Sequence, residues 1–307
     1  MTVDSSVLLR DGPWRHQHVP ANGARFHVAV SGPDDRDVPL VVLLHGFPQF
    51  WWAWRHQLGA LADAGYRVAA MDLRGTGGSD KPPSGYDVPM LTRDVAGLIR
   101  SLGADRAVIV GHGLGGGDVA WAMPAYQPAV TQAIAVLSEP HPLQQRLDLR
   151  SALRPGAARH LAYAQLPYLA ERSLTRTDLV VRLLREWGGR GYPDPTTAAV
   201  YREALQVPFA AHSALEGARW LFRSVPRMDG RRYAAALRTA RPLPVLQVHG
   251  GADGCRPAAT AAPSGRLAAR LGPAYRFELL PGVGHFLPEE SPERVTRLLT
   301  QWLATLP

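Results

Sequence analysis

The sequence predicts an α/β protein with a mostly parallel central sheet that is interrupted by one inserted helical block. Short apolar runs of strand length alternate with segments of helical spacing through residues 1–138. Such alternation is typical of parallel strands joined by right-handed crossovers. Residues 139–240 have almost wholly helical character and are rich in Arg, Ala and Leu, and strand-like runs resume in 241–307. We therefore expect one core domain, formed by the outer two ranges, with 139–240 as a lid over the carboxyl ends of the strands.

The expected elements follow from hydrophobic periodicity. The alternating stretch 25–30 predicts an early antiparallel strand, and the apolar run 38–44 predicts a strand that is buried on both faces. A Gly-Phe-Pro break then precedes 51–64, whose apolar residues recur at helical spacing. The remaining expected elements are strands at 67–71, 108–110, 133–137, 245–248 and 275–280, helices at 90–102 and 293–306, and a glycine-rich loop at 74–79.

Composition indicates a soluble, cytoplasmic protein. The chain of 307 residues is 46% hydrophobic and 20% charged, which provides enough apolar material for a large core. Its single cysteine, Cys255, cannot form an internal disulfide, the N-terminus does not resemble a signal peptide, and no apolar run approaches the roughly 18 residues of a membrane span. The net charge of +8 comes from scattered arginines without a dense basic cluster. We expect a small-molecule substrate, no nucleic-acid or membrane partner, and a monomer or homodimer.

The run 108–117, Val-Ile-Val-Gly-His-Gly-Leu-Gly-Gly-Gly, contains the most informative motif. An apolar strand that ends in such a glycine-rich turn and leads into a helix is the nucleophile elbow of the α/β-hydrolase fold, which normally presents a Ser, Asp or Cys at its tip. Here the tip is Gly113. Glycine has no side chain that could attack a substrate, so the motif predicts the fold while arguing against its usual covalent chemistry.

Two later residues form a candidate general base. Asp253 follows the strand at 245–248, and His285 lies between the last strand and the last helix. The chain order of acid and then histidine is the one that α/β-hydrolases use. The carboxylate would fix the imidazole tautomer and stabilise its charged form. Loop residues of these types are often incidental, but their positions after consecutive strands favour the catalytic interpretation.

The turn His45-Gly46-Phe47-Pro48 directly follows a predicted buried strand. It would point the backbone N–H of Phe47 towards the elbow, where the N–H of Leu114 is also expected to point. Two convergent N–H groups form an oxyanion hole, which stabilises negative charge that develops on a substrate oxygen.

The stretch from His45 to Asp87 resembles the matching region of the epoxide hydrolases and the haloalkane or fluoroacetate dehalogenases. It reads HGFPQFWWAWRHQLGALADAGYRVAAMDLRGTGGSDKPPSGYD. The Leu-Ser-Glu-Pro-His-Pro entry to the lid, Asp253 and His285 extend the resemblance over nearly the whole chain. For an epoxide hydrolase, the resemblance implies that an elbow Asp opens the oxirane, a His–Asp pair activates water against the resulting ester, and lid tyrosines protonate the epoxide oxygen.

The chain departs from this pattern at several functional positions. Gly113 replaces the nucleophile, and Gly217 and Ala218 stand before Arg-Trp where the family tends to show a tyrosine pair. Leu114 stands where dehalogenases place a halide-holding tryptophan, which weighs against dehalogenation. The first lid tyrosine aligns near His160 or Tyr163. Candidate substrate-binding residues are His45, Pro48, Trp51, His160, Tyr163, Trp187, Trp220 and Phe286.

Three polar residues near the elbow are alternatives for chemistry. Glu139, at the end of a neighbouring strand, is a candidate second acid or base, and Asp118 is a less favoured replacement nucleophile. We expect His112 to face structural neighbours.

Three functions remain open at this point. The first is an enzyme in which His285 deprotonates water or a substrate group without a covalent intermediate, either hydrating an epoxide or catalysing a cyclisation, elimination or rearrangement in secondary metabolism. The second is a non-catalytic ligand-binding protein, and the third is ordinary hydrolysis with a relocated nucleophile on Glu139 or Asp118. No motif indicates a metal or another cofactor.

Overall fold

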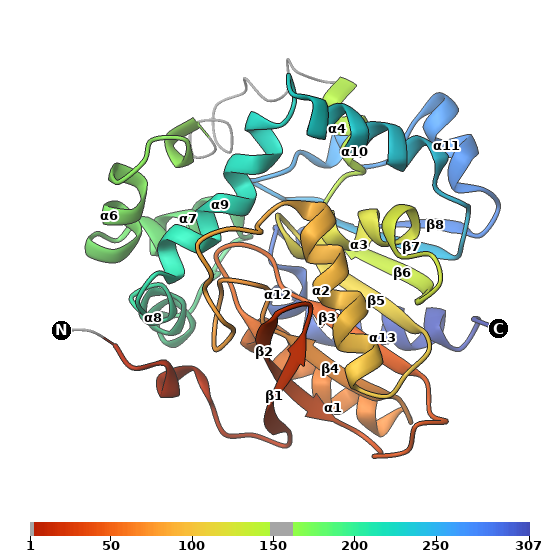
Figure 1. Cartoon of the computed structure of the whole chain (residues 1–307), viewed down its shortest axis with the longest axis horizontal. Helices are drawn as coiled ribbons and strands as arrows, with labels where there is room; N and C mark the ends of the chain where they lie inside the picture. Colours follow the sequence, from red (N-terminus) through yellow and green to blue (C-terminus); the bar gives the residue numbers. More distant parts are fainter. Residues whose placement is uncertain (1–2, 148–161) are drawn as a thin grey trace.

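The computed structural model describes residues 3–147 and 162–307 and confirms the predicted α/β class. An eight-stranded sheet has the order β1-β2-β4-β3-β5-β6-β7-β8, with helices on both of its faces (Figure 1). The strands are β1 (Arg15–Ala21), β2 (Ala24–Ser31), β3 (Leu40–Leu44), β4 (Arg67–Met71), β5 (Ala107–His112), β6 (Thr131–Leu137), β7 (Val245–Gly250) and β8 (Tyr275–Leu280).

The first two strands form an antiparallel hairpin at the edge of the sheet, and β2 also pairs antiparallel with β4. All pairs from β4 to β8 are parallel. The strand β1 was not expected, because its sequence RHQHVPA is mostly polar and only Val19 and Ala21 are buried. Pairing with β2, rather than its own hydrophobic pattern, makes this segment a strand.

The central strands divide their side chains between two cores, as the period of two in a strand requires. In β3, Val41 and Leu43 join an apolar cluster with helix α1, while Val42 and Leu44 join the cluster on the opposite face with helices α2 and α3. Every residue of β3 and β5 is buried. The core helices are η2 (Trp51–Trp54), α1 (Arg55–Asp63), α2 (Val88–Ser101), α3 (Gly116–Tyr126), α11 (Gly265–Leu271), α12 (Leu287–Glu290) and α13 (Pro292–Leu303), with short turns η1 (Ser5–Leu8) and η4 (Ala258–Thr260).

The helical block between β6 and β7 lies together above one side of the sheet, where α6 to α9 appear in green and teal in Figure 1. Its helices are α4 (Pro142–Leu147), α6 (Leu169–Arg176), α7 (Leu179–Trp187), α8 (Pro195–Ala204), α9 (Ala210–Arg223) and α10 (Met228–Thr239). Helix α10 packs against the core helix α3, and Tyr233 stacks on Tyr126 with ring centroids 6.3 Å apart. Packing against the sheet domain therefore resumes before residue 240.

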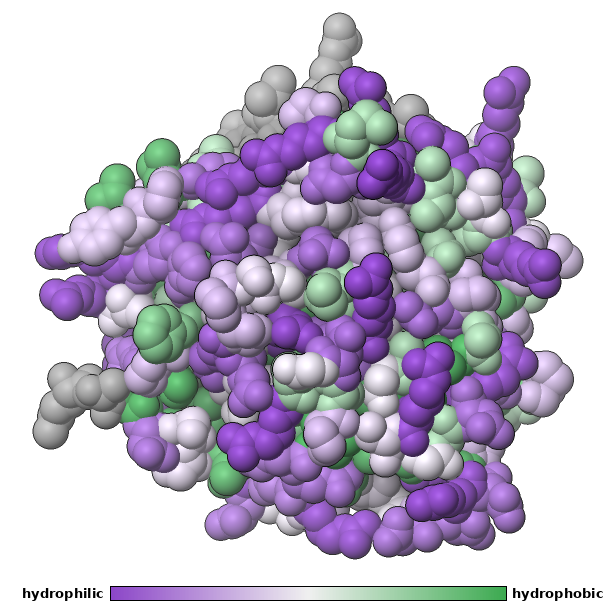
Figure 2. Space-filling view, in the orientation of Figure 1, coloured by the Kyte–Doolittle hydropathy of each residue, from purple (hydrophilic) through white to green (hydrophobic). Residues whose placement is uncertain are grey.

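The face seen in Figure 2 is mostly hydrophilic, with hydrophobic residues in small separate groups. In the part of the chain that the structure describes, no helix is both long enough and apolar enough to cross a membrane.

Candidate active site

The elbow turn places Gly113 between the end of β5 and the start of α3. Its φ is +51°, in the left-handed region that glycine enters with little strain. Its N–H donates to the Leu137 carbonyl at 2.8 Å. The turn is also tight, because a Cβ at Gly111 would lie 2.1 Å from the carbonyl oxygen of Gly116. Glycines thus allow the strand and the helix to approach closely enough to present the tip.

His285 and Asp253 form the predicted pair. The Nδ1 of His285 lies 2.9 Å from Oδ2 of Asp253, and both side chains are fully buried. The other carboxylate oxygen of Asp253 accepts the N–H groups of Cys255 and Arg256, each at 2.7 Å. Burial opposes ionisation of Asp253, but its interactions with His285, with His249 and with the N–H of Arg256 together outweigh burial, and the pKa of the carboxyl is lowered.

The ionised carboxylate fixes the tautomer of the imidazole. Since it can only accept, Nδ1 of His285 carries the proton and Nε2 keeps a lone pair. This Nε2 is buried and has no hydrogen-bond partner among the described residues. A Cβ built on Gly113 would lie 2.9 Å from Nε2. The base therefore faces the position of the usual nucleophile, so closely that a side chain there would displace the imidazole.

Two further histidines support this pair. His112 donates from Nε2 to the carbonyl of His285 at 2.8 Å, so it holds the backbone of the base, as its structural interpretation predicted. Burial and the nearby His285 lower the pKa of His112 to about 3, which keeps it neutral. His249 was not predicted. Its Nε2 lies 2.9 Å from the Arg256 carbonyl and 3.4 Å from Oδ2 of Asp253. The signal was its place at the end of β7, four residues before Asp253.

The structure removes one of the two donors predicted for the oxyanion hole. The N–H of Phe47 donates to the carbonyl of Leu114 at 2.9 Å, so it is not available to a substrate oxygen, and this part of the prediction is wrong. The turn instead forms an antiparallel bridge between Gly46 and Gly115. The N–H of Leu114 has no acceptor among the described residues.

The two carboxylates proposed as substitutes have other partners. Asp118 accepts the N–H of Gly115 at 3.0 Å and caps α3, while burial and the Glu139 carboxylate raise its pKa. Glu139 forms a buried ion pair with Arg256, with Nη2 and Oε1 3.2 Å apart. These contacts give both residues structural partners and lend no support to a nucleophile relocated to either one.

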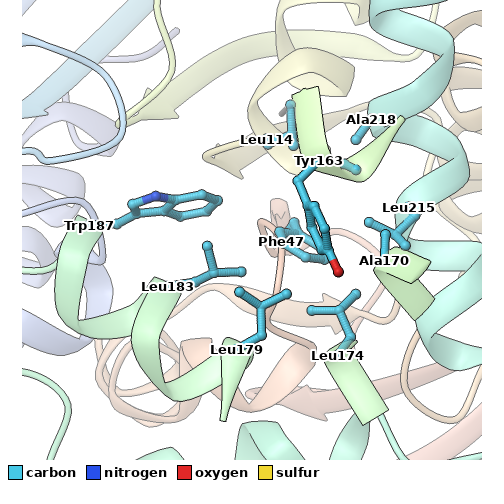
Figure 3. A pocket seen from close by; sticks show the side chains of 11 residues that line it. Phe47, Leu114, Tyr163, Ala170, Leu174, Leu179, Leu183, Trp187, Leu215 and Ala218 are labelled. Carbon is cyan, nitrogen blue, oxygen red and sulfur yellow. The ribbon is translucent and has the colours of Figure 1, made fainter. Parts of the chain in front are cut away.

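An apolar cavity lies between the core and the lid (Figure 3). Trp187 contributes to its wall and also contacts the imidazole of His285 edge-on, with ring centroids 5.6 Å apart. The hydroxyl of Tyr163 points away from Leu114 in Figure 3 and donates to the carbonyl of Leu169 at 3.1 Å. The lining comprises Phe47, Leu114, Tyr163, Ala164, Ala170, Leu174, Leu179, Leu183, Trp187, Leu215 and Ala218.

A second cavity, which we call the polar chamber, shares Phe47, Leu114 and Ala218 with the first. Hydroxyl and amide side chains contribute to its wall alongside apolar ones. Its other lining residues are His45, Gly46, Gln49, Leu73, Arg74, Thr76, Tyr86, Leu91, Gly115, Ser213, Ala214 and Gly217. His45 is held by Thr76, with Nε2 and Oγ1 2.9 Å apart. His285 lines neither cavity.

Several predicted substrate-binding residues have other contacts, and those predictions are wrong. Trp51 is buried against His16 of β1 and His27 of β2, and its indole N–H donates to the Leu8 carbonyl at 2.9 Å. Trp220 faces α10 and donates to Asp229 at 3.1 Å. Phe286 is fully buried and stacks on Tyr192, and neither it nor Pro48 lines either cavity. His160 lies outside the described residues.

Comparison with known proteins agrees with this fold. The alpha/beta hydrolase family matches residues 41–298. The chain belongs to the alpha/beta hydrolase family, and its relatives include epoxide hydrolases. Epoxide hydrolase A of Mycobacterium tuberculosis is 32% identical over 320 residues, covering 94% of this chain and 97% of the relative.

Solved structures show the same likeness. The crystal structure of epoxide hydrolase A from Mycobacterium thermoresistibile has a TM-score of 0.73 and 29% identity, and covers 96% of this chain and 99% of that one. An epoxide hydrolase from an endophytic Streptomyces has a TM-score of 0.76 and 28% identity, with 96% of each chain covered.

Proposed function

We propose that the chain is an epoxide-hydrolase-like enzyme that acts on a hydrophobic small molecule through a general base, without a covalent ester intermediate. One observation carries the proposal. The Nε2 of His285 has no partner among the residues that the structure describes, and it faces the elbow tip, where a Cβ on Gly113 would lie 2.9 Å away. Asp253 holds the opposite nitrogen at 2.9 Å. In this arrangement His285 can remove a proton, whereas Gly113 at the elbow tip has no side chain that could attack a substrate.

In the hydrolytic reaction, water adjacent to Nε2 would lose a proton to His285 as its oxygen attacks an epoxide carbon. The carbon–oxygen bond of the ring breaks and leaves an alkoxide. The backbone N–H of Leu114 is the available donor to that oxygen. Asp253 stabilises the imidazolium, which then returns the proton to the alkoxide. The product is a diol, and no bond to the protein forms.

A second candidate is a base-catalysed cyclisation, elimination or rearrangement, for example of a polycyclic metabolite. The weakness of the acid side of the site favours it. Gly217 and Ala218 carry no hydroxyl, and the hydroxyl of Tyr163 is already donated to Leu169. An epoxide that opens without a proton donor must form a poorly stabilised alkoxide. A reaction that begins by deprotonating the substrate needs only the base.

A third candidate is a ligand-binding protein without turnover. The observation that favours it is that His285 lines neither cavity. Trp187 lines the apolar cavity and contacts the imidazole of His285. Catalysis requires this indole to move aside when substrate binds.

The test is a panel of hydrophobic epoxides and esters in oxygen-18 water, followed by mass spectrometry of products and of acid-quenched protein. We compare the wild type with His285→Ala and with His212→Ala, a control at an exposed lid histidine. Label in products from the wild type and the control, but not from His285→Ala, together with unmodified protein, supports direct hydration. A covalent adduct would refute the absence of an intermediate. Unlabelled isomers indicate the second candidate, and binding without any product indicates the third.

A further inference from the structure

The polar chamber owes its space to two small residues on α9. A Cβ built on Gly217 would meet only the carbonyl oxygen of Tyr86, at 3.7 Å. Ala218 packs against Leu114 and lines both cavities. A bulky side chain at either position would project into space that is now cavity. The chamber and the apolar cavity therefore adjoin along Phe47, Leu114 and Ala218, within reach of one elongated molecule.

Gln49 is one of the residues that line this chamber, and its amide is buried. Its side chain is 4% exposed, and its Nε2 donates to the carboxylate of Glu289 at 2.5 Å and to the hydroxyl of Tyr201 at 3.2 Å. A carboxylate only accepts, so the nitrogen must be the atom on that side. The amide oxygen Oε1 is buried and has no partner among the described residues. A buried acceptor without a partner is rare and costs free energy unless a ligand satisfies it.

The orientation of this amide is fixed by its neighbours. Glu289 also accepts from Arg55, from Tyr192 at 2.8 Å and from Tyr201 at 2.7 Å. Because all of these donors converge on one carboxylate, the Gln49 amide cannot rotate without breaking the cluster. Oε1 is thus a preorganised acceptor.

The chemistry of the chamber selects a neutral donor. The one guanidinium in its wall, that of Arg74, is held by both oxygens of Asp94, at 2.7 and 2.6 Å. An anionic group would find this charge already neutralised and would face the Oε1 dipole and the nearby Glu289. A hydroxyl can donate to Oε1 without these penalties. Tyr86 and Ser213, which also line the chamber, are joined by a hydrogen bond 2.9 Å long.

We propose that the polar chamber is a binding subsite for a hydroxyl group at one end of an elongated hydrophobic substrate. Gln49 Oε1 accepts its hydrogen bond once the side chains that cover this atom move apart, and Gly217 and Ala218 leave the room that the hydroxyl occupies. The apolar remainder passes Phe47 and Leu114 into the first cavity. The proposal deepens the proposed function and rests on it only for the identity of the bound molecule as substrate.

The experiment measures equilibrium binding of 1-dodecanol and of its methyl ether, which cannot donate, with 1-hexanol as a short probe. The proteins are the wild type, Gln49→Leu, Gly217→Leu and the control His212→Leu, which adds a leucine to the exposed side of α9. We expect the wild type and the control to prefer dodecanol over its ether by about three- to tenfold, the range of one neutral hydrogen bond. Gln49→Leu loses this preference while ether binding is unchanged. Gly217→Leu weakens the long probes more than hexanol.

Equal affinity of the wild type for dodecanol and the ether would overturn the proposal, as would a Gly217→Leu variant that binds all probes normally. If Gln49→Leu fails to fold because Glu289 loses a donor, Gly217→Leu still decides, since leucine is a better helix former than glycine. No turnover is measured, so the result is independent of His285. If the wild type shows no preference for the alcohol while the separate oxygen-18 test finds turnover that depends on His285, the subsite alone is refuted. A wild type that prefers the alcohol but shows no turnover that depends on His285 refutes the proposed function alone.

Discussion

The two sides of the elbow differ in the number of polar side chains that they carry. We call them the base side, which holds Asp253 and His285, and the tip side, which holds Gly113 and the facing part of the lid. On the side of β7 and β8, Asp253 receives donors on both oxygens, and His285 is held through Nδ1, its N–H and its carbonyl. On the side of the tip and the lid stand Gly113, Gly217 and Ala218, which carry no functional group. The contrast teaches that the candidate base and the position of the usual nucleophile lie on separate segments, so one can persist where the other is absent.

The largest effect, a fall in kcat, is expected from Asp253→Asn, because this substitution changes the partner of the candidate base His285. An amide nitrogen facing His285 would donate rather than accept, so Nδ1 would become the acceptor and the proton would move to Nε2. The base would lose its lone pair. We expect kcat to fall by about 10² to 10⁴, the usual contribution of a general base, with the melting temperature measured alongside.

His249→Gln is the matched control, because it removes a neighbour of Asp253 that lies 3.4 Å away without changing the tautomer of His285. A small loss in this variant beside a large loss in Asp253→Asn is the expected pattern. Full activity of Asp253→Asn would mean that the pair is structural and that the contrast between the two sides has no catalytic meaning.

Glu289→Gln tests whether the Glu289 carboxylate holds the lid on the core. The Glu289 carboxylate joins Arg55 and Gln49 of the core to Tyr192 and Tyr201 of the lid. The substitution leaves the Arg55 guanidinium without its counter-ion in a largely buried place. We expect a loss of about 3 kcal/mol in the free energy of unfolding, measured by urea denaturation. Glu293→Gln, on the first turn of α13, is the control, and equal losses in the two variants would contradict this assignment.

The free energy of unfolding is expected to depend on pH through His112, whose Nε2 holds the carbonyl of His285. Burial and His285 lower its folded pKa to about 3, whereas the unfolded value is about 6.5. Between these values only the unfolded chain takes up the proton, so this contribution to stability falls as pH falls, by about 1.4 kcal/mol per pH unit. His112→Gln keeps an N–H donor and does not titrate. Its stability deficit relative to the wild type should therefore shrink from pH 7 to pH 5, whereas parallel curves would contradict the assignment.

Much of the fold and of the base could be predicted because each depends on local pattern. The fully buried strands β3 and β5 appear as continuous apolar runs, and Asp253 and His285 directly follow strands of a parallel sheet. Strand β1 could not be predicted, because its polar sequence has no strand-like hydrophobic pattern and the segment becomes a strand only by pairing with β2.

The errors in the site have one physical cause, which is the direction in which a group points. The N–H of Phe47 bonds to Leu114, and the indoles of Trp51 and Trp220 face the β1–β2 hairpin and α10. Residue type and spacing indicate which segments meet, but they do not give the rotation of a turn or the side of a helix that faces a cavity. Gln49 was missed for the same reason, because its polar partners come from remote segments.

The smallest expected effect is on the stability of a variant at the elbow tip. Gly113→Ala adds a methyl group at φ +51°, 2.9 Å from Nε2 of His285. Gly265→Ala is a close backbone match, since its φ is +55° and nothing lies within 4 Å of its Cβ position. Both should lose about 1 kcal/mol from the left-handed backbone. The further cost of moving the imidazole falls on Gly113→Ala alone, and chemical denaturation measures the difference. Equal losses would show that His285 retreats freely, in which case Gly113 is not what allows the base to lie so close to the tip.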